Sequence, residues 1–137
     1  MSLFNQKEGF LNEALALGNA EKEVGRAGWV EHNSRLDHAG IDFIIHWMDG
    51  KDWIVQVKTS AELVFKAPIS KYMDNGVNFI VSMDDGDEDF FAEYNRVSSY
   101  PYFSDEKKEY LLDTMIHISS FRNMVRVRAK KLLSGVA

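Results

Sequence analysis

The sequence contains no cysteine, which excludes disulfide frameworks, thiolate metal sites and cysteine catalysis. It has only 2 prolines and 9 glycines among 137 residues, too few for a collagen-like chain or a flexible linker. No apolar run approaches the ~20 residues of a membrane-spanning helix, and the first ten residues lack the basic-then-apolar pattern of a signal peptide. We therefore expect a cytoplasmic domain with no membrane contact.

Signatures of other enzyme classes are also missing. The sequence has neither the GxxxxGK[ST] loop nor the GxGxxG turn that cradle phosphates, so no nucleotide cofactor is expected. The GxSxG elbow of serine hydrolases is absent. The histidines lack metal-ligand spacing, and we expect ordinary hydrogen bonds for all four: His32, His38, His46 and His117.

The composition is that of an ordinary globular protein, with 45% hydrophobic and 27% charged residues. No repeat or linker divides it, so we predict one domain over 1–137, with a core at about 8–83 and a helical region at about 104–135. The hydrophobic pattern predicts an α/β fold in which helices flank a mixed central β-sheet.

The expected elements follow the chain in order. Apolar residues at helical spacing predict a helix over 5–27, and β-branched and aromatic runs predict a hairpin of strands 41–48 and 53–58 around Asp49-Gly50. After it we expect a possible strand at 60–66, a helix at 68–75, a strand at 77–83, an extended piece at 90–94, and helices at 104–118 and 120–135.

The net charge of −5 hides a polarised distribution. Residues 84–93 carry six acids and no base, which is typical of a solvated turn, whereas 121–137 carry five bases and no acid. Arg122, Arg126 and Lys130 recur at every fourth position and form one helical stripe. We predict that this stripe contacts phosphates, a solvated helix face being the alternative.

Chemistry is concentrated in the hairpin, in Gly40-Ile41-Asp42 and in Gln56-Val57-Lys58. Residues two apart on a strand point to the same face, so Gln56 and Lys58 project together. Asp42 shares that face if paired residue numbers sum to an even number, for example Asp42 opposite Lys58. This requires a three- or five-residue loop, or a bulge, instead of a two-residue turn. A carboxylate and a carbonyl oxygen can hold Mg²⁺ or Mn²⁺, and an ammonium can stabilise phosphate charge.

These residues resemble the PD-(D/E)xK nuclease superfamily, which has the restriction-endonuclease-like fold. The resemblance covers about 8–83 and is closest to the branch with Gln in place of the usual acid; Ile41 stands where the family has proline. It implies Asp42 and Gln56 as metal ligands and Lys58 as a catalytic residue. A further glutamate on the first helix is implied, with Glu13 the candidate and Glu21 or Glu23 the alternatives. Asp37 is a possible auxiliary ligand.

The resemblance implies a Mg²⁺-dependent endonuclease that hydrolyses DNA phosphodiester bonds. A chain this small carries one active site, so cutting both strands favours a homodimer. Two other functions stay open. One is an inactive module of the same fold that binds nucleic acid or a protein, and the other is a subunit of a larger assembly that docks through 84–103. The aromatic residues of that segment stack bases or, alternatively, pack against the core: Phe90, Phe91, Tyr94, Tyr100, Tyr102 and Phe103.

Overall fold

A computed structural model describes the backbone of residues 3–135 and the side chains of 11–135; positions 1–2 and 136–137 of the predicted domain lie outside this range. The helices are α1 (Leu3–Val24), α2 (Ser34–His38), α3 (Ile69–Asp74), α4 (Asp87–Val97), α5 (Asp105–Thr114) and α6 (Ile118–Ser134), with 3-10 turns η1 (Gly25–Ala27) and η2 (Ala61–Lys66). The strands are β1 (Gly28–Glu31), β2 (Phe43–Trp47), β3 (Asp52–Lys58), β4 (Phe79–Ser82) and β5 (Met115–His117).

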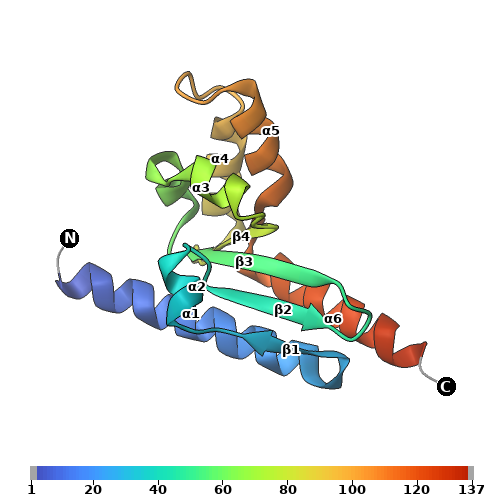
Figure 1. Ribbon diagram of the computed structural model, residues 1–137. Coiled ribbons are helices and arrows are strands. Elements are labelled where there is room, and N and C mark those ends of the chain that lie inside the picture. The colour runs from blue at the N-terminus through green and yellow to red at the C-terminus, as the bar shows by residue number, and fades with distance from the viewer. Residues whose placement is uncertain (1–2, 136–137) are drawn as a thin grey trace.

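The strands form one mixed sheet in the order β1-β2-β3-β4-β5. The first three strands are antiparallel neighbours, and β4 and β5 join in parallel. Parallel strands need a crossover connection, which α3 supplies before β4 and α4 with α5 supply before β5. The α/β architecture with helices flanking a mixed sheet is therefore confirmed (Figure 1).

Each face of the sheet has its own hydrophobic core. On one face, α1 and α6 pack against alternate residues of the hairpin, including Phe43, Ile45 and Val55. On the other face, α3, α4 and α5 cover β4 and the neighbouring part of β3, with Ile80 at the centre. The second group of helices does not extend to β1, so the β1 side of this face is open (Figure 1).

The hairpin turn confirms the expected loop. Trp47 N–H donates to the Lys51 carbonyl at 2.9 Å, so three residues, 48–50, form the connection. Gly50 has a φ of 88°, a left-handed conformation that glycine adopts without steric cost. The pairing of Ile44 with Ile54 gives the predicted even sum. The example pairing of Asp42 with Lys58 was wrong, because Ile44 pairs with Ile54 and the first pair of the ladder is Phe43 with Val55.

Several predicted elements were wrong. Residues 61–66 form η2 instead of a strand, and 90–94 lie inside α4, which begins with three acids in its first turn. Acids there interact favourably with the helix dipole, so only 84–86 of the acidic segment remain a loop. The strands β1 and β5 were not predicted, and β5 splits the helical region expected at 104–135. The helix expected over 5–27 ends at Val24.

Among the described residues, none of the helices combines the length and the apolar character that crossing a bilayer requires.

Two glycine substitutions test the turn and the long helix with opposite signs. Gly50→Ala is expected to destabilise the protein by roughly 1–2 kcal/mol, because alanine is strained at a φ of 88°. Gly18→Ala is expected to stabilise it by about 0.5–1 kcal/mol, because Gly18 lies inside α1 with nothing within 4 Å of the added Cβ. Urea unfolding measures both. Equal shifts of the same sign would contradict these conformations.

Candidate metal centre

The strand ladder is irregular at Asp42, immediately before β2. The Asp42 N–H donates at 3.0 Å to the carbonyl of Val55, the residue that also pairs with Phe43, so the chain bulges here. The Asp42 carboxylate accepts a hydrogen bond from Val57 N–H at 2.6 Å. The bulge thus lets this side chain occupy a position in the ladder that a backbone carbonyl would otherwise fill.

Three carboxylates converge at this point. Glu13 from α1, Asp37 from α2 and Asp42 each offer an oxygen, and these oxygens lie within 4.8 Å of one another. Glu13 precedes the buried Ala16 by three residues, which sets it on the side of α1 that faces the sheet. Asp37 is exposed, whereas Glu13 and Asp42 are half-buried. The structure therefore brings together the three acids singled out in the sequence for the site.

Local structure holds the segment between Asp37 and Asp42 in place. Asn33 caps α2 by accepting Leu36 N–H at 3.0 Å, and Gly40 turns the chain towards β2 with a φ of 80°. Two donors from α3 hold the turn: Lys71 Nζ lies 3.3 Å from the His38 carbonyl and Asn75 Nδ2 lies 2.7 Å from the Ala39 carbonyl. The helix α3 therefore fixes the loop that carries two of the three acids.

The electrostatics of the cluster favour a cation. Burial raises the pKa of Asp42 to about 7; the Val57 N–H opposes this rise, and the carboxylates of Glu13 and Asp37 add to it. Adjacent carboxylates repel one another when ionised, and a divalent cation relieves this repulsion. The cluster is thus short of positive charge near neutral pH.

Gln56 and Lys58 extend the group along β3. Gln56 is 9% exposed, and its carbonyl oxygen Oε1 accepts no hydrogen bond within the described part of the chain. A buried amide oxygen without a donor is costly unless a ligand fills the position. Lys58 lies on the same face of the strand, two residues further, with its ammonium 5.3 Å from the centre of the Tyr72 ring.

This donor set fits a hard divalent cation. Carboxylate and amide oxygens are the ligands that Mg²⁺ and Mn²⁺ take in proteins. Ligands of an octahedral Mg²⁺ with ~2.1 Å bonds are ~3.0 Å apart when adjacent and ~4.2 Å apart when opposite. The oxygens of the three acids lie within 4.8 Å of one another, so they would move closer together to bind one ion. The residues of this chain therefore suit the implied metal.

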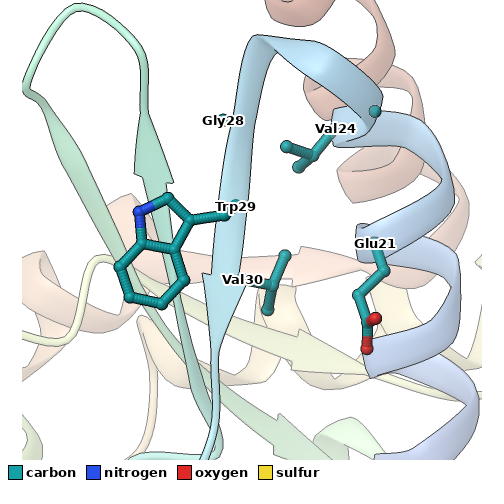
Figure 2. A pocket seen from close by; sticks show the side chains of 6 residues that line it. Glu21, Val24, Gly28, Trp29 and Val30 are labelled. Carbon is teal, nitrogen blue, oxygen red and sulfur yellow. The ribbon is translucent and has the colours of Figure 1, made fainter.

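The other glutamates considered for the site lie elsewhere. Glu23 accepts two hydrogen bonds at 3.0 Å from Arg126 and lies 3.7 Å from Arg122. Glu21 lines a pocket of about 280 Å³ between α1 and β1 (Figure 2), together with Val24, Gly25, Gly28, Trp29 and Val30. None of the candidate metal ligands lines this pocket. Of Glu13, Glu21 and Glu23, only Glu13 joins the cluster.

The basic stripe of α6 is partly engaged. Arg122 and Arg126 interact with Glu23 and so attach α6 to α1, while Lys130 is exposed. The helix packs on the sheet face opposite to Gln56 and Lys58. The stripe contacts α1 at Glu23, which is ten residues and ~15 Å along this helix from Glu13, and phosphate binding by the stripe stays a prediction.

Histidines near and far from the cluster behave differently. His38 and His32 are exposed, and the backbone carbonyl of His38 accepts from Lys71. His117 is buried and hydrogen-bonds Ser119 Oγ and the Asp84 carbonyl at 2.8 and 2.9 Å. His46 lies between two carboxylates at 2.8 Å each. The rings of His46 and His117 therefore make the hydrogen bonds expected of them, and nothing tests this expectation for the rings of His32 and His38.

Sequence reasoning missed Lys71 and Asn75. Lys71 lies on α3 and Asn75 caps its C-terminus, and both donate to the loop before Asp42. The Cβ position of Gly40 lies 3.6 Å from Lys71 Nζ, so this ammonium covers the turn next to the cluster. A lysine on a short helix gives no sequence signal of such a role. Only its spacing of four residues from Asn75 indicates that both side chains can contact the same segment.

Comparison of the chain with protein-family models, with curated proteins and with solved structures gave no match.

The raised pKa of Asp42 predicts how stability varies with pH. A carboxyl whose folded pKa is about 7, above its unfolded 3.8, stabilises the fold at low pH and loses this contribution as pH rises through 7. Asp42→Asn removes the loss, so without metal it is expected to raise stability by roughly 2–4 kcal/mol at pH 8 and less at pH 5. Thermal and urea unfolding at both pH values measure this.

Asp113→Asn, an exposed substitution on α5, is the control and is expected to change little at either pH. A pH-independent effect of Asp42→Asn would contradict the charge argument.

Proposed function

We propose that this chain is a Mg²⁺- or Mn²⁺-dependent endonuclease that hydrolyses phosphodiester bonds in DNA, with a restriction-endonuclease-like core of the PD-(D/E)xK type. The observation that carries the proposal is the cluster of Glu13, Asp37 and Asp42, together with the buried oxygen of Gln56 on the neighbouring strand β3, which has no donor among the described residues. The order of elements supports it. A helix, a strand entered by the aspartate, a strand with Gln-x-Lys, a helix and a parallel strand follow one another as the resemblance implies.

Each residue has a distinct role in this proposal. Asp42, Glu13 and Gln56 hold the cation, with Asp37 as an auxiliary ligand on the exposed side. The bound cation would lower the pKa of a water and neutralise phosphate charge. Lys58 presents an ammonium that stabilises the charge developing on the phosphate, and Tyr72 confines this side chain from one side.

The phosphate group needs cations that are not already neutralised. Lys58 lies two residues beyond Gln56 on β3, and Lys71 on α3 donates in its described hydrogen bond only to the backbone carbonyl of His38, the residue after Asp37. Binding of the DNA backbone therefore concentrates on this side of the sheet. One cluster cuts one strand, so cleavage of both strands would use a homodimer.

Lys58→Ala is expected to lower plasmid cleavage at least ~100-fold while metal binding is retained, because an ammonium is not a ligand. Lys51→Ala, at the opposite end of the hairpin, is the matched control and keeps activity. Supercoiled-plasmid cleavage with Mg²⁺ or Mn²⁺ gives the rates, and calorimetry gives metal affinity. Loss of metal binding in Lys58→Ala would show that the fold of the site, and not its chemistry, was disturbed.

The ligand assignments make a second, separate prediction. Asp42→Asn is expected to weaken Mg²⁺ binding and cleavage together, whereas Gln56→Glu adds a carboxylate and is expected to tighten Mg²⁺ with activity intact or raised. If Asp42→Asn leaves metal affinity unchanged, the metal site is wrong. Metal binding without any cleavage would favour a subunit of a larger assembly, and neither property would favour an inactive binding module.

A further inference from the structure

The open part of the sheet carries an exposed tryptophan. Trp29 on β1 pairs with His46 on β2, which pairs with Asp52 on β3, so the three side chains lie on one face. Trp29 is 59% exposed. Figure 2 shows its side chain on the side of β1 opposite to Val30 and α1. This is the face on which Gln56 and Lys58 also lie, by alternation along β3 from Asp52.

The ring of Trp29 is held in place from one side. The indole and the His46 ring stack with centroids 4.3 Å apart and an interplanar angle of 23°. Both nitrogens of His46 lie 2.8 Å from a carboxylate, Glu31 at Nε2 and Asp52 at Nδ1. Only the doubly protonated imidazole donates to both carboxylates at once, and rotation of the ring would break both bonds. Burial opposes this charge, but the two carboxylates outweigh it and raise the pKa of His46.

Charges around the indole cancel. Arg35 lies 3.7 Å from Glu31, which also bonds His46, and His46 bonds Asp52, so positive and negative groups alternate in one row. A row without net charge gives phosphate no electrostatic attraction. What it leaves exposed is a flat, immobilised aromatic surface with carboxylate oxygens at its rim. Such a surface suits the uncharged face of a nucleobase. The amino groups of the base can donate hydrogen bonds to the carboxylate oxygens at the rim.

On these grounds, and resting on the proposed nuclease function, we infer that Trp29 is a stacking site for an unpaired base of the DNA strand cut at the metal centre. Trp29 lies level with His46, which is four residue steps along the chain from Asp42, so Trp29 and Asp42 are ~14 Å apart once one strand spacing is added. This corresponds to about four nucleotides at the ~3.4 Å rise of a stacked strand, and fewer if the strand is extended. In a duplex both faces of each base are covered, so the site selects single-stranded or unpaired DNA.

Binding of a fluorescent oligonucleotide of ~12 nucleotides tests the inference, in EDTA so that nothing is cleaved. Trp29→Ala is expected to weaken single-strand binding about 5- to 150-fold, the range for one lost stacking contact, and to change duplex binding less than about twofold. Trp29→Phe keeps an aromatic ring and is expected to keep most of the affinity. Met48→Ala, which removes an apolar side chain that is 51% exposed at the hairpin turn, is the control and is expected to change neither.

Abasic substitutions locate the base. For the unmodified protein, removing one particular base is expected to weaken binding, and the same removal is expected to have no effect on Trp29→Ala. Trp47 and Trp53 are buried or half-buried, so quenching of tryptophan fluorescence by the oligonucleotide is expected to vanish in Trp29→Phe. Equal losses on single and double strands, or no loss in Trp29→Ala, would overturn the inference. Failure of the proposed function shows separately, as absent plasmid cleavage by the unmodified protein.

Discussion

The hydrogen bond from Val57 N–H to the Asp42 carboxylate is the interaction on which the candidate site depends. It requires β2 and β3 to be in a fixed register, because only one backbone N–H of β3 lies level with Asp42. The register in turn follows from the hydrophobic alternation of β2, where Phe43, Ile45 and Trp47 are buried and the residues between them are not. A shift by one residue would expose this core and separate the carboxylate from its donor.

A carboxylate held in this way lies where charge is unfavourable without a counterion. Burial and the neighbouring acids raise the pKa of Asp42, and the Val57 N–H compensates only in part. The three acids and the amide oxygen come from different parts of the chain. Glu13 lies on α1, Asp37 on α2 and Asp42 just before β2, and Gln56 lies on β3. The site therefore exists only in the folded protein, and a metal that binds it stabilises the fold by the free energy of binding.

Sequence patterns predicted the central part of this arrangement and missed its margins. The hairpin could be predicted because β-branched and aromatic residues flank Asp49-Gly50. Glu13 came from the resemblance, with Glu21 and Glu23 as alternatives that only the structure separates from it. The strands β1 and β5 were missed because they have four and three residues, too few to show alternation. β5 is stabilised by pairing with β4 and lies between two helices, so local propensity gives no indication of it.

The same limit applies to the surroundings of the site. Asp37 was only an auxiliary candidate in the sequence because the turn at Gly40 decides whether it meets Asp42, and that turn is held by α3. The contacts of Lys71 join residues 33 positions apart, a separation that no local pattern encodes. The exposed position of Trp29 on the sheet could not be predicted either, because β1 itself was not predicted.

The division of the sheet follows from how far its helices reach. One face is covered by α1 and α6 along the whole hairpin, and this face supplies most of the buried residues of β2. On the other face the helices stop near β3, because α3 has only six residues and its end is fixed to the loop before Asp42. The short helix thus has two consequences: it positions the acids, and it leaves the row from Trp29 to Asp52 open to solvent. One face of the sheet therefore supplies the buried core, and part of the other face is accessible to solvent. Charged and aromatic residues on the open part are held by their contacts with one another without being buried.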